Sequence, residues 1–428
     1  MAKILVSPQS AFIPIIRELL IRNHSIITIE PNFAKTLRDL DLPNITALME
    51  HITPQNQSDA LRNAAQTIHR LYSPFDTHDL DERTANWLKS DLPAYAYSKV
   101  ADLTLFAEVI NTVNPDAILL HNDVEPLTRA AAQWGRFNHK PTLHVPHANY
   151  QEIENSGSDI HAIITATHIL SSGSYQSNWY AKRRNNVECK IIETGLPQFD
   201  EWANLNLDPV QSRQSLGLDL DKPVVTYASS WRQNTNLLGM HDGVEDTYLA
   251  ILEVAKQMSD VQFIIKCHPR GNNAQWHLDK AKELDVKGIL VTPHHLNPVL
   301  QSSNLLLAYG PSNILLEASH IPWIKLACTS GYEDDDEITK INTDPPDVDE
   351  IISTLYNILD GPMYNLDQFR RKYLGACDGL NYLRIVKVVE KVLEDYGTSK
   401  GNALTLTNQA ASTSNREAVQ TELQTKDG

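Results

Sequence analysis

The chain has 428 residues and a mass of 48.1 kDa, so about two to three domains of ~150 residues are expected rather than one hydrophobic core. Its composition of 42% hydrophobic, 7% aromatic and 21% charged residues is typical of globular proteins and excludes disordered, collagen-like and disulfide-stapled chains. Thirty-seven basic against 53 acidic residues give a net charge of −16. Nucleic-acid binding requires a basic surface that neutralises phosphates, so we expect no nucleic-acid partner.

The four cysteines are far apart and form no C-x-x-C pair, which indicates neither a structural zinc site nor a disulfide framework. Polar residues at positions 7–10 interrupt the apolar start before a secretion signal could form. No stretch reaches the ~18 apolar residues of a membrane span. We therefore expect a cytoplasmic protein that does not span a membrane, although peripheral association with one stays open.

The first elements predict a β-α-β unit. Residues 3–7 form an apolar strand, the apolar spacing from Phe12 to Leu20 predicts a helix, and residues 25–29 form a second strand. Ser10 is expected to cap the helix, with Pro14 in its first turn. Such a unit requires a parallel sheet with helices on its faces.

Residues 43–101 are polar and helix-leaning, and we expect them to determine the choice of acceptor. Beyond them, Pro126 is expected to start a helix, and three further strands are predicted at residues 117–121, 142–145 and 162–165.

A linker-like segment at residues 195–206 precedes a second alternation of strands and helices. Strands are predicted at residues 223–228, 261–266, 289–291, 305–309 and 323–326, and helices at 244–258, 313–319, 348–359 and 367–396. The expected fold is α/β, with two Rossmann-like, doubly wound lobes facing a cleft. The expected parts are an acceptor-side domain over residues 1–203, a donor-binding domain over 204–366, a returning helix over 367–396 and a disordered tail over 397–428.

In open parallel sheets the ligand crevice lies at the carboxyl ends of the strands, so residues that follow each strand are the candidates for a site. Ser312 and Asn313, at the start of a helix, offer amides and a hydroxyl to phosphate oxygens. Glu317, one turn further on, could accept hydrogen bonds from ribose hydroxyls. The positive charge that a diphosphate requires, and the polar loop beside it, would come from Ser229, Ser230, Arg232, Lys266, His268 and Arg270.

Each of these residues also has an ordinary structural interpretation. Ser312 and Asn313 are frequent helix caps, Glu317 could be a surface carboxylate, and His268 could be a loop histidine bonded to backbone. Their clustering after three successive strands favours the binding site.

His147 follows a buried strand and could deprotonate an acceptor hydroxyl, because a histidine pKa lies near neutral pH. Asp123 or Glu125 could orient His147 or act as the base instead. The alternative is that His144 and His147 are ordinary strand-end residues. No third ligand accompanies them, so no metal site is expected.

The sequence lacks G-x-G-x-x-G, G-x-x-x-x-G-K-[ST] and G-x-S-x-G, which counts against dinucleotide oxidoreductases, P-loop NTPases and serine hydrolases. The tandem lobes, with Thr194-Gly195-Leu196-Pro197, Lys266-Cys267-His268-Pro269 and the run from Tyr309-Gly310-Pro311-Ser312-Asn313 to Glu317, resemble the GT-B glycosyltransferase superfamily. Within it, the CDP-glycerol glycerophosphotransferase-like proteins and the UDP-N-acetylglucosamine 2-epimerases are the most similar branches.

The resemblance implies that His268, Ser312 and Asn313 bind donor phosphates beside Arg232, that Tyr309 belongs to the donor site and that Glu317 lies near the ribose. Val145-Pro146-His147-Ala148 is similar to the strand-end motif of the glycerophosphotransferases, which implies that His147 is the base. Asp123 matches an acidic residue of the epimerases. The resemblance also implies that no catalytic metal or resident cofactor is needed.

Three functions are therefore expected, in this order. The first is transfer of a sugar or glycerophosphate-like group from a nucleotide-activated donor such as a UDP-sugar to an acceptor hydroxyl, in surface polysaccharide biosynthesis. The second is epimerisation of a nucleotide sugar. The third is binding of nucleotide or carbohydrate without catalysis.

Overall fold

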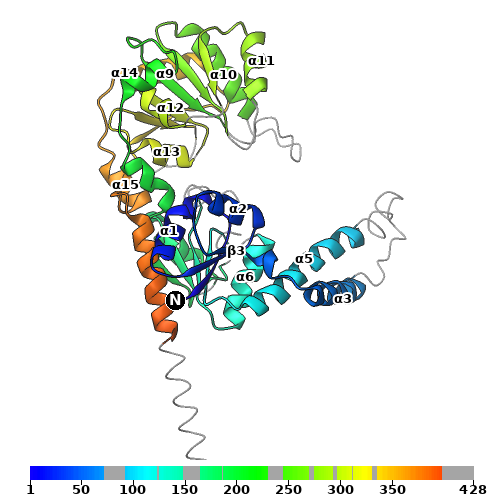
Figure 1. Cartoon of the computed structure of the whole chain (residues 1–428). Helices are drawn as coiled ribbons and strands as arrows, with labels where there is room; N and C mark the ends of the chain where they lie inside the picture. The colour runs from blue at the N-terminus through cyan, green and yellow to red at the C-terminus, as the bar shows by residue number, and fades with distance from the viewer. Residues whose placement is uncertain are drawn as a thin grey trace, which may run out of the picture.

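The computed structural model describes residues 1–71, 92–122, 125–147, 164–185, 187–229, 244–268, 274–292, 296–310, 312–329 and 335–397. These residues form two α/β lobes, shown one above the other in Figure 1, and each lobe is built on one parallel sheet. The predicted α/β fold with two doubly wound lobes is confirmed. The predicted disordered tail lies outside the described residues.

The first sheet has the strand order β3-β2-β1-β4-β5-β6-β7. From β1 successive strands are added toward one edge of the sheet as far as β3, and from β4 toward the other edge, so the neighbouring pair β1 and β4 is the switch point where such sheets bind ligands. The strands are short, and those inside the sheet are almost wholly buried because helices cover both faces, whereas the edge strand β7 is partly exposed. Their bounds are β1 Lys3–Val6, β2 Ser25–Thr28, β3 Ile45–Ala47, β4 Ala117–Leu120, β5 Thr142–His144, β6 His168–Ser171 and β7 Lys190–Glu193.

The helices of the first lobe are α1 Ile13–Ile21, α2 Pro31–Asp39, α3 Pro54–Leu71, α5 Leu92–Val113, α6 Pro126–Phe137 and α7 Ser174–Arg183. Pro126 begins α6, as predicted. The long helices α3 and α5 pack against each other and project from the lobe, as Figure 1 shows. They account for much of the segment that sequence periodicity did not resolve.

The second sheet has the order β10-β9-β8-β11-β12-β13, with its switch point between β8 and β11. Its strands are β8 Val224–Ala228, β9 Gln262–Lys266, β10 Ile289–Thr292, β11 Leu305–Ala308, β12 Lys325–Cys328 and β13 Ile338–Lys340. Its helices are α9 Pro209–Ser215, α10 Val244–Gln257, α11 Ala274–Glu283, α12 Leu296–Ser302, α13 Asn313–Ala318 and α14 Val348–Asp360.

The chain passes between the lobes at two segments that contact each other. On the outward pass, a 3-10 turn at Pro197–Phe199 leads into the short helix α8 Asp200–Ala203. On the return, α15 Asp367–Leu374 ends at Gly375, and residues 381–397 are helical. The carboxylate of Asp200 accepts hydrogen bonds from the backbone amides of Asn381 and Tyr382, at 3.0 and 2.9 Å. Asp200 therefore caps the start of helix 381–397 from the other segment.

Helix 381–397 packs on the first lobe beside α1, as Figure 1 shows. Its Glu390 lies 2.6 Å from a guanidinium nitrogen of Arg22, which follows α1. Val386, Val389 and Val392 are buried in the same apolar cluster as Ile15 and Ile16 of α1.

Several predicted elements were wrong in detail. Ser10 does not cap α1: it opens a 3-10 turn over Ser10–Phe12, and the N-cap is Phe12, which makes no side-chain cap. Residues 164–165 are not in a strand. The strand is β6, three residues further on. It was not predicted because two of its four buried residues, His168 and Ser171, are polar.

The segment predicted to link the lobes, residues 195–206, contributes to the main core through the buried side chains of Leu196, Phe199 and Trp202. The helix predicted at 367–396 is two helices, since Gly375 has a positive φ of 71° that ends α15. The strand predicted at 323–326 begins two residues later, at Lys325.

Candidate functional site

Three adjacent strands of the second sheet, β9, β8 and β11, end beside one another and bring predicted site residues together. Ser229 follows β8, and its backbone amide donates to the carbonyl of Lys266, the last residue of β9, over 3.0 Å. His268 lies two residues beyond Lys266. Tyr309 follows β11, and its amide donates to the carbonyl of Ala228 over 3.1 Å. These contacts place Ser229, Lys266 and Tyr309 at the switch point of the sheet.

The turn after β11 leads directly into α13. Gly310 has a φ of 69°, a conformation that suits glycine, and its amide donates to the hydroxyl of Thr329 over 2.9 Å. Ser312 is the N-cap residue of α13, yet its side chain makes no capping hydrogen bond. The Ser312 hydroxyl therefore makes no hydrogen bond to an amide of α13, so helix capping by the side chain does not explain this residue.

Glu317 and Lys266 form an electrostatic pair near this turn. Burial and, to a smaller extent, the nearby Glu201 of α8 raise the pKa of Glu317 to about 8, although Lys266 opposes the rise. Burial lowers the pKa of Lys266, which is 6% exposed and donates through Nζ to the carbonyl of Cys267 over 2.8 Å. At neutral pH Glu317 is thus mostly protonated and can both donate and accept hydrogen bonds, unlike the carboxylate acceptor expected from sequence.

His147 lies just past β5 at the carboxyl edge of the first sheet. Its backbone carbonyl accepts a hydrogen bond of 3.2 Å from the side-chain amide of Gln198, in the segment that leads to the second lobe. The ring of His147 meets the ring of His121 edge-on, with centroids 5.9 Å apart. His121 follows β4, so the two rings belong to adjacent strand ends.

A hydrogen-bond network fixes His121. Its Nδ1 lies 2.7 Å from the hydroxyl of Ser7, which follows β1, and its Nε2 lies 2.8 Å from the amide nitrogen of Asn122. The Asn122 oxygen accepts from the amide of Glu125 and from the hydroxyl of Thr128, so the Asn122 nitrogen must face His121 as a donor. His121 therefore carries its proton on Nδ1 and accepts at Nε2.

Burial, together with His147 and His144, lowers the pKa of His121 to about 4, so its ring is neutral at physiological pH. Ser7, His121 and Asn122 were not among the site residues predicted from the sequence. One signal was present: Ser7 and His121 directly follow the two strands that flank the switch point of the first sheet.

Four predicted site residues, Asp123, Ser230, Arg232 and Arg270, lie outside the described residues. Within the described part of the chain, no group of three His, Cys, Asp or Glu side chains could hold a metal ion. No described helix is long and apolar enough to cross a bilayer.

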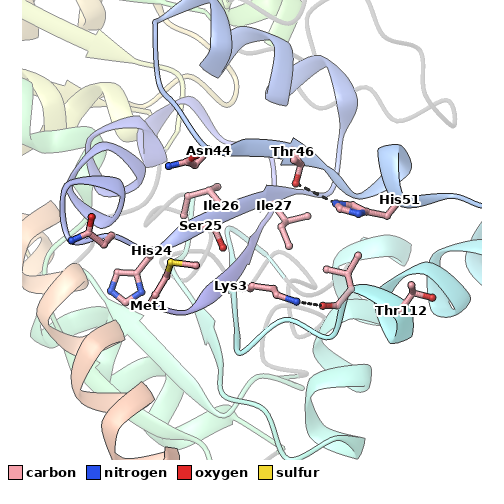
Figure 2. Close-up of a pocket in the computed structure, with 12 residues that line it drawn as sticks. Met1, Lys3, His24, Ser25, Ile26, Ile27, Asn44, Thr46, His51 and Thr112 are labelled. Atoms are coloured by element: carbon pink, nitrogen blue, oxygen red, sulfur yellow. Dashed lines mark hydrogen bonds between the residues drawn. The ribbon is translucent and has the colours of Figure 1, made fainter.

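A separate cavity of about 570 Å³ lies at the opposite edge of the first sheet, where the amino ends of β1 and β2 meet the end of α5 (Figure 2). Lys3 donates across it to the carbonyl of Val113, and His51 bonds to Thr46. These polar groups are thus already used within the protein, and the cavity contains none of the predicted site residues.

Two parallel sheets in the orders 3-2-1-4-5-6-7 and 10-9-8-11-12-13, joined in tandem with a terminal helix returned to the first lobe, define the GT-B fold. Solved structures support this assignment. The UDP-GlcNAc 2-epimerase of Neisseria meningitidis bound to UDP-GlcNAc superposes with a TM-score of 0.54 and 15% identity, over 91% of this chain and 100% of that chain.

The UDP-GlcNAc 2-epimerase of Methanocaldococcus jannaschii gives a TM-score of 0.54 at 15% identity, over 91% of this chain and 99% of its own. A glycosyltransferase of Rickettsia africae gives 0.51 at 11% identity, over 92% and 98%. These likenesses establish the fold.

Residues 144–308 match the family model described as CDP-Glycerol:Poly(glycerophosphate) glycerophosphotransferase. The match begins at His144 and ends at Ala308, so it includes His147, Ser229, Lys266 and His268. A search of the curated proteins gives no significant match to the sequence.

Proposed function

We propose that the protein is a transferase that moves a sugar or a glycerophosphate-like group from a nucleotide-activated donor to an acceptor hydroxyl, in the synthesis of a surface polysaccharide. The observation that carries the proposal is the convergence of Ser229, Lys266 and Tyr309 at one switch point, with Glu317 electrostatically coupled to Lys266. The family match over residues 144–308 supports the same reaction class.

In this proposal the donor diphosphate binds at the second lobe. His268 and the amide-rich turn at Ser312 and Asn313 stabilise the charge that develops on the leaving phosphate. Arg232 and Arg270 follow β8 and β9 in the chain and are proposed to add positive charge, with Ser230 beside them. A protonated Glu317 does not repel the diphosphate and can bond to donor hydroxyls.

His147 is the proposed base. It takes the proton of the acceptor hydroxyl as the oxygen attacks the donor, and the bond to the leaving phosphate breaks with its electron pair. The neutral His121 ring beside His147 adds no positive charge that would oppose protonation of His147. The reaction is proposed to need no metal and no resident cofactor, and to take place in the cytoplasm, where the four cysteines would stay reduced.

The binding half of the proposal is tested with His268→Ala. Calorimetric titration with UDP and CDP should show affinity reduced about tenfold or more, because a charge-assisted hydrogen bond to phosphate is lost. His51→Gln, in the cavity of Figure 2, should bind as the unaltered protein does. Equal affinity in the His268→Ala variant would refute the phosphate assignment.

A nucleotide-sugar epimerase is the second candidate, with Asp123 as a proton-transfer residue, and the fold shared with the epimerases favours keeping it. Incubation of UDP-sugars without acceptor separates the two functions. Epimerised product with the nucleotide attached would support the isomerase, whereas release of nucleotide that depends on an acceptor supports the transferase. A non-catalytic relative would bind nucleotide and give neither product.

A further inference from the structure

A second, smaller cavity lies at the amino ends of β6 and β7, at the opposite edge of the first sheet from His147. Its volume is about 230 Å³. The end of α6, the residues leading into β6, the start of β7 and Tyr396 of helix 381–397 line it. Since small-molecule sites usually measure about 300–1,000 Å³, this cavity suits a phosphate group with a short substituent rather than a whole nucleotide.

The lining is strongly basic although the chain as a whole is acidic. It includes Arg136, Lys140 and Lys190, whereas Glu188 is the acid among the described lining residues. Lys140 forms an ion pair with Asp116, with 3.6 Å between Nζ and Oδ1. Arg136 and Lys190 have no ion-pair partner within the part of the chain that the structure describes. Two cations that form no ion pair with a described residue therefore line one small cavity, against the single carboxylate of Glu188.

His168 supplies a further polar group, and its hydrogen bonds fix its protonation. The hydroxyl of Thr167 donates to the carbonyl of Thr142 over 2.9 Å and accepts from the Thr142 amide over 2.9 Å. Its single proton is used, so it must accept from Nδ1 of His168 over 2.8 Å. Nε2 of His168 is then an acceptor, and it has no partner among the described residues.

We propose that this cavity binds the phosphate group of a small phosphorylated molecule, with Arg136 and Lys190 bonding to phosphate oxygens and Nε2 of His168 accepting from a phosphate hydroxyl. A carboxylate has no hydroxyl to offer once ionised, so it would leave Nε2 unsatisfied. The site is independent of the transferase proposal, because none of its lining residues belongs to the candidate active site.

Proton uptake is an expected signature of binding. Burial and the nearby Lys190 lower the pKa of His168 to about 4, so its ring is neutral in the empty cavity, although Asp395 opposes the shift. A phosphate monoester loses its second proton near a pKa of about 6 and is mostly a dianion at pH 7.5. The bound state needs one proton between Nε2 and the phosphate oxygen, so the complex takes up a proton from solution.

The test is calorimetric titration of the full chain at pH 7.5 and constant ionic strength, with inorganic phosphate and with glycerol 3-phosphate in separate runs. The double variant Arg136→Ala/Lys190→Ala should raise the Kd for phosphate about tenfold or more, because two charge-assisted hydrogen bonds are lost. Lys35→Ala removes an exposed charge on α2 and should leave the Kd unchanged. The ligand that binds more tightly distinguishes the free ion from an esterified phosphate.

His168→Gln should still bind phosphate, but without proton uptake. Proton uptake is measured by repeating the titration in two buffers of different ionisation enthalpy and comparing the binding enthalpies. Urea unfolding of each variant verifies that the fold is retained. Absence of phosphate binding, an unchanged Kd in the double variant, or an equal loss in Lys35→Ala would overturn the proposal.

Discussion

The amide nitrogen of Asn122 donates to Nε2 of His121 over 2.8 Å, and this bond determines which nitrogen of the neighbouring ring carries the proton. The Asn122 oxygen is held by two donors, so the amide cannot turn around. As a result, a neutral ring of fixed orientation stands against His147 at the switch point of the first sheet.

Asn122→Ala should lower the free energy of unfolding by about 2–3 kcal/mol, since it removes one bond to His121 and leaves the Glu125 amide and the Thr128 hydroxyl with one acceptor fewer. Thr128→Val deletes a single hydroxyl from the same network and should cost about 1 kcal/mol. Urea unfolding measures both. Equal losses would show that Asn122 is not the centre of the network.

His147→Gln should reduce turnover about 100-fold or more and leave nucleotide binding intact, if the imidazole is the base of the proposed transfer. Single-turnover kinetics with donor and acceptor, alongside UDP titration, separate chemistry from binding. Retained turnover would assign the base to another group, and Asp123→Asn is then the next variant.

Glu317 predicts a specific dependence of stability on pH. Its folded pKa of about 8 lies above the ordinary 4.5, so the folded state holds a proton that the unfolded chain releases. Its contribution is fully present below pH 4.5 and is lost as pH rises through 8. Glu317→Gln cannot ionise, so the variant should gain about 3–4 kcal/mol of stability relative to the unaltered protein between pH 5 and pH 8.5. Melting temperatures across this range measure the gain, and a constant difference would contradict it.

Gly375→Ala should be much more damaging than Gly217→Ala, although both glycines have positive φ, at 71° and 67°. A Cβ at position 375 would lie 2.5 Å from the carbonyl oxygen of Ser172, whereas one at position 217 meets nothing within 4 Å. Gly217→Ala should lower the free energy of unfolding by about 1 kcal/mol from backbone strain alone. Gly375→Ala should lower it by at least about 2 kcal/mol more, because of the steric clash. Denaturant unfolding of the two variants isolates the steric part.

Asp200→Ala should destabilise the protein by about 2 kcal/mol, because the first amides of helix 381–397 lose their acceptors. Asp200→Asn keeps one oxygen and should cost less. Limited proteolysis should show earlier cleavage near residue 380 in the Ala variant. Identical digestion of the two variants would argue against a capping role.

Most strands of the second lobe were predictable because they are continuous apolar runs between polar turns, as in Val224–Ala228 and Leu305–Ala308. β6 and β12 were missed or shifted because buried strands there contain His168, Ser171 and Lys325. Such residues are tolerated through contacts that are distant in sequence. Lys325, for example, donates to the carbonyls of Ile358 and Leu359 at the end of α14.

From the sequence, only those parts of the candidate site that directly follow predicted strands could be located. Ser229, Lys266 and Tyr309 could be expected to lie close together because parallel strands bring their carboxyl ends to one edge of the sheet. The roles of Ser7 and Asn122 depend on the pairing of β1 with β4, which joins residues more than a hundred positions apart. The protonated state of Glu317 depends equally on burial that only the folded chain creates.

The valines of helix 381–397 complete the apolar core beside α1, so residues near the two ends of the described chain share one buried surface. During synthesis the ribosome releases α1 long before its covering helix. The core of the lobe that is translated earlier is consequently completed only after the later lobe has been made, and until helix 381–397 emerges the isoleucines of α1 stay accessible to aggregation or to chaperones.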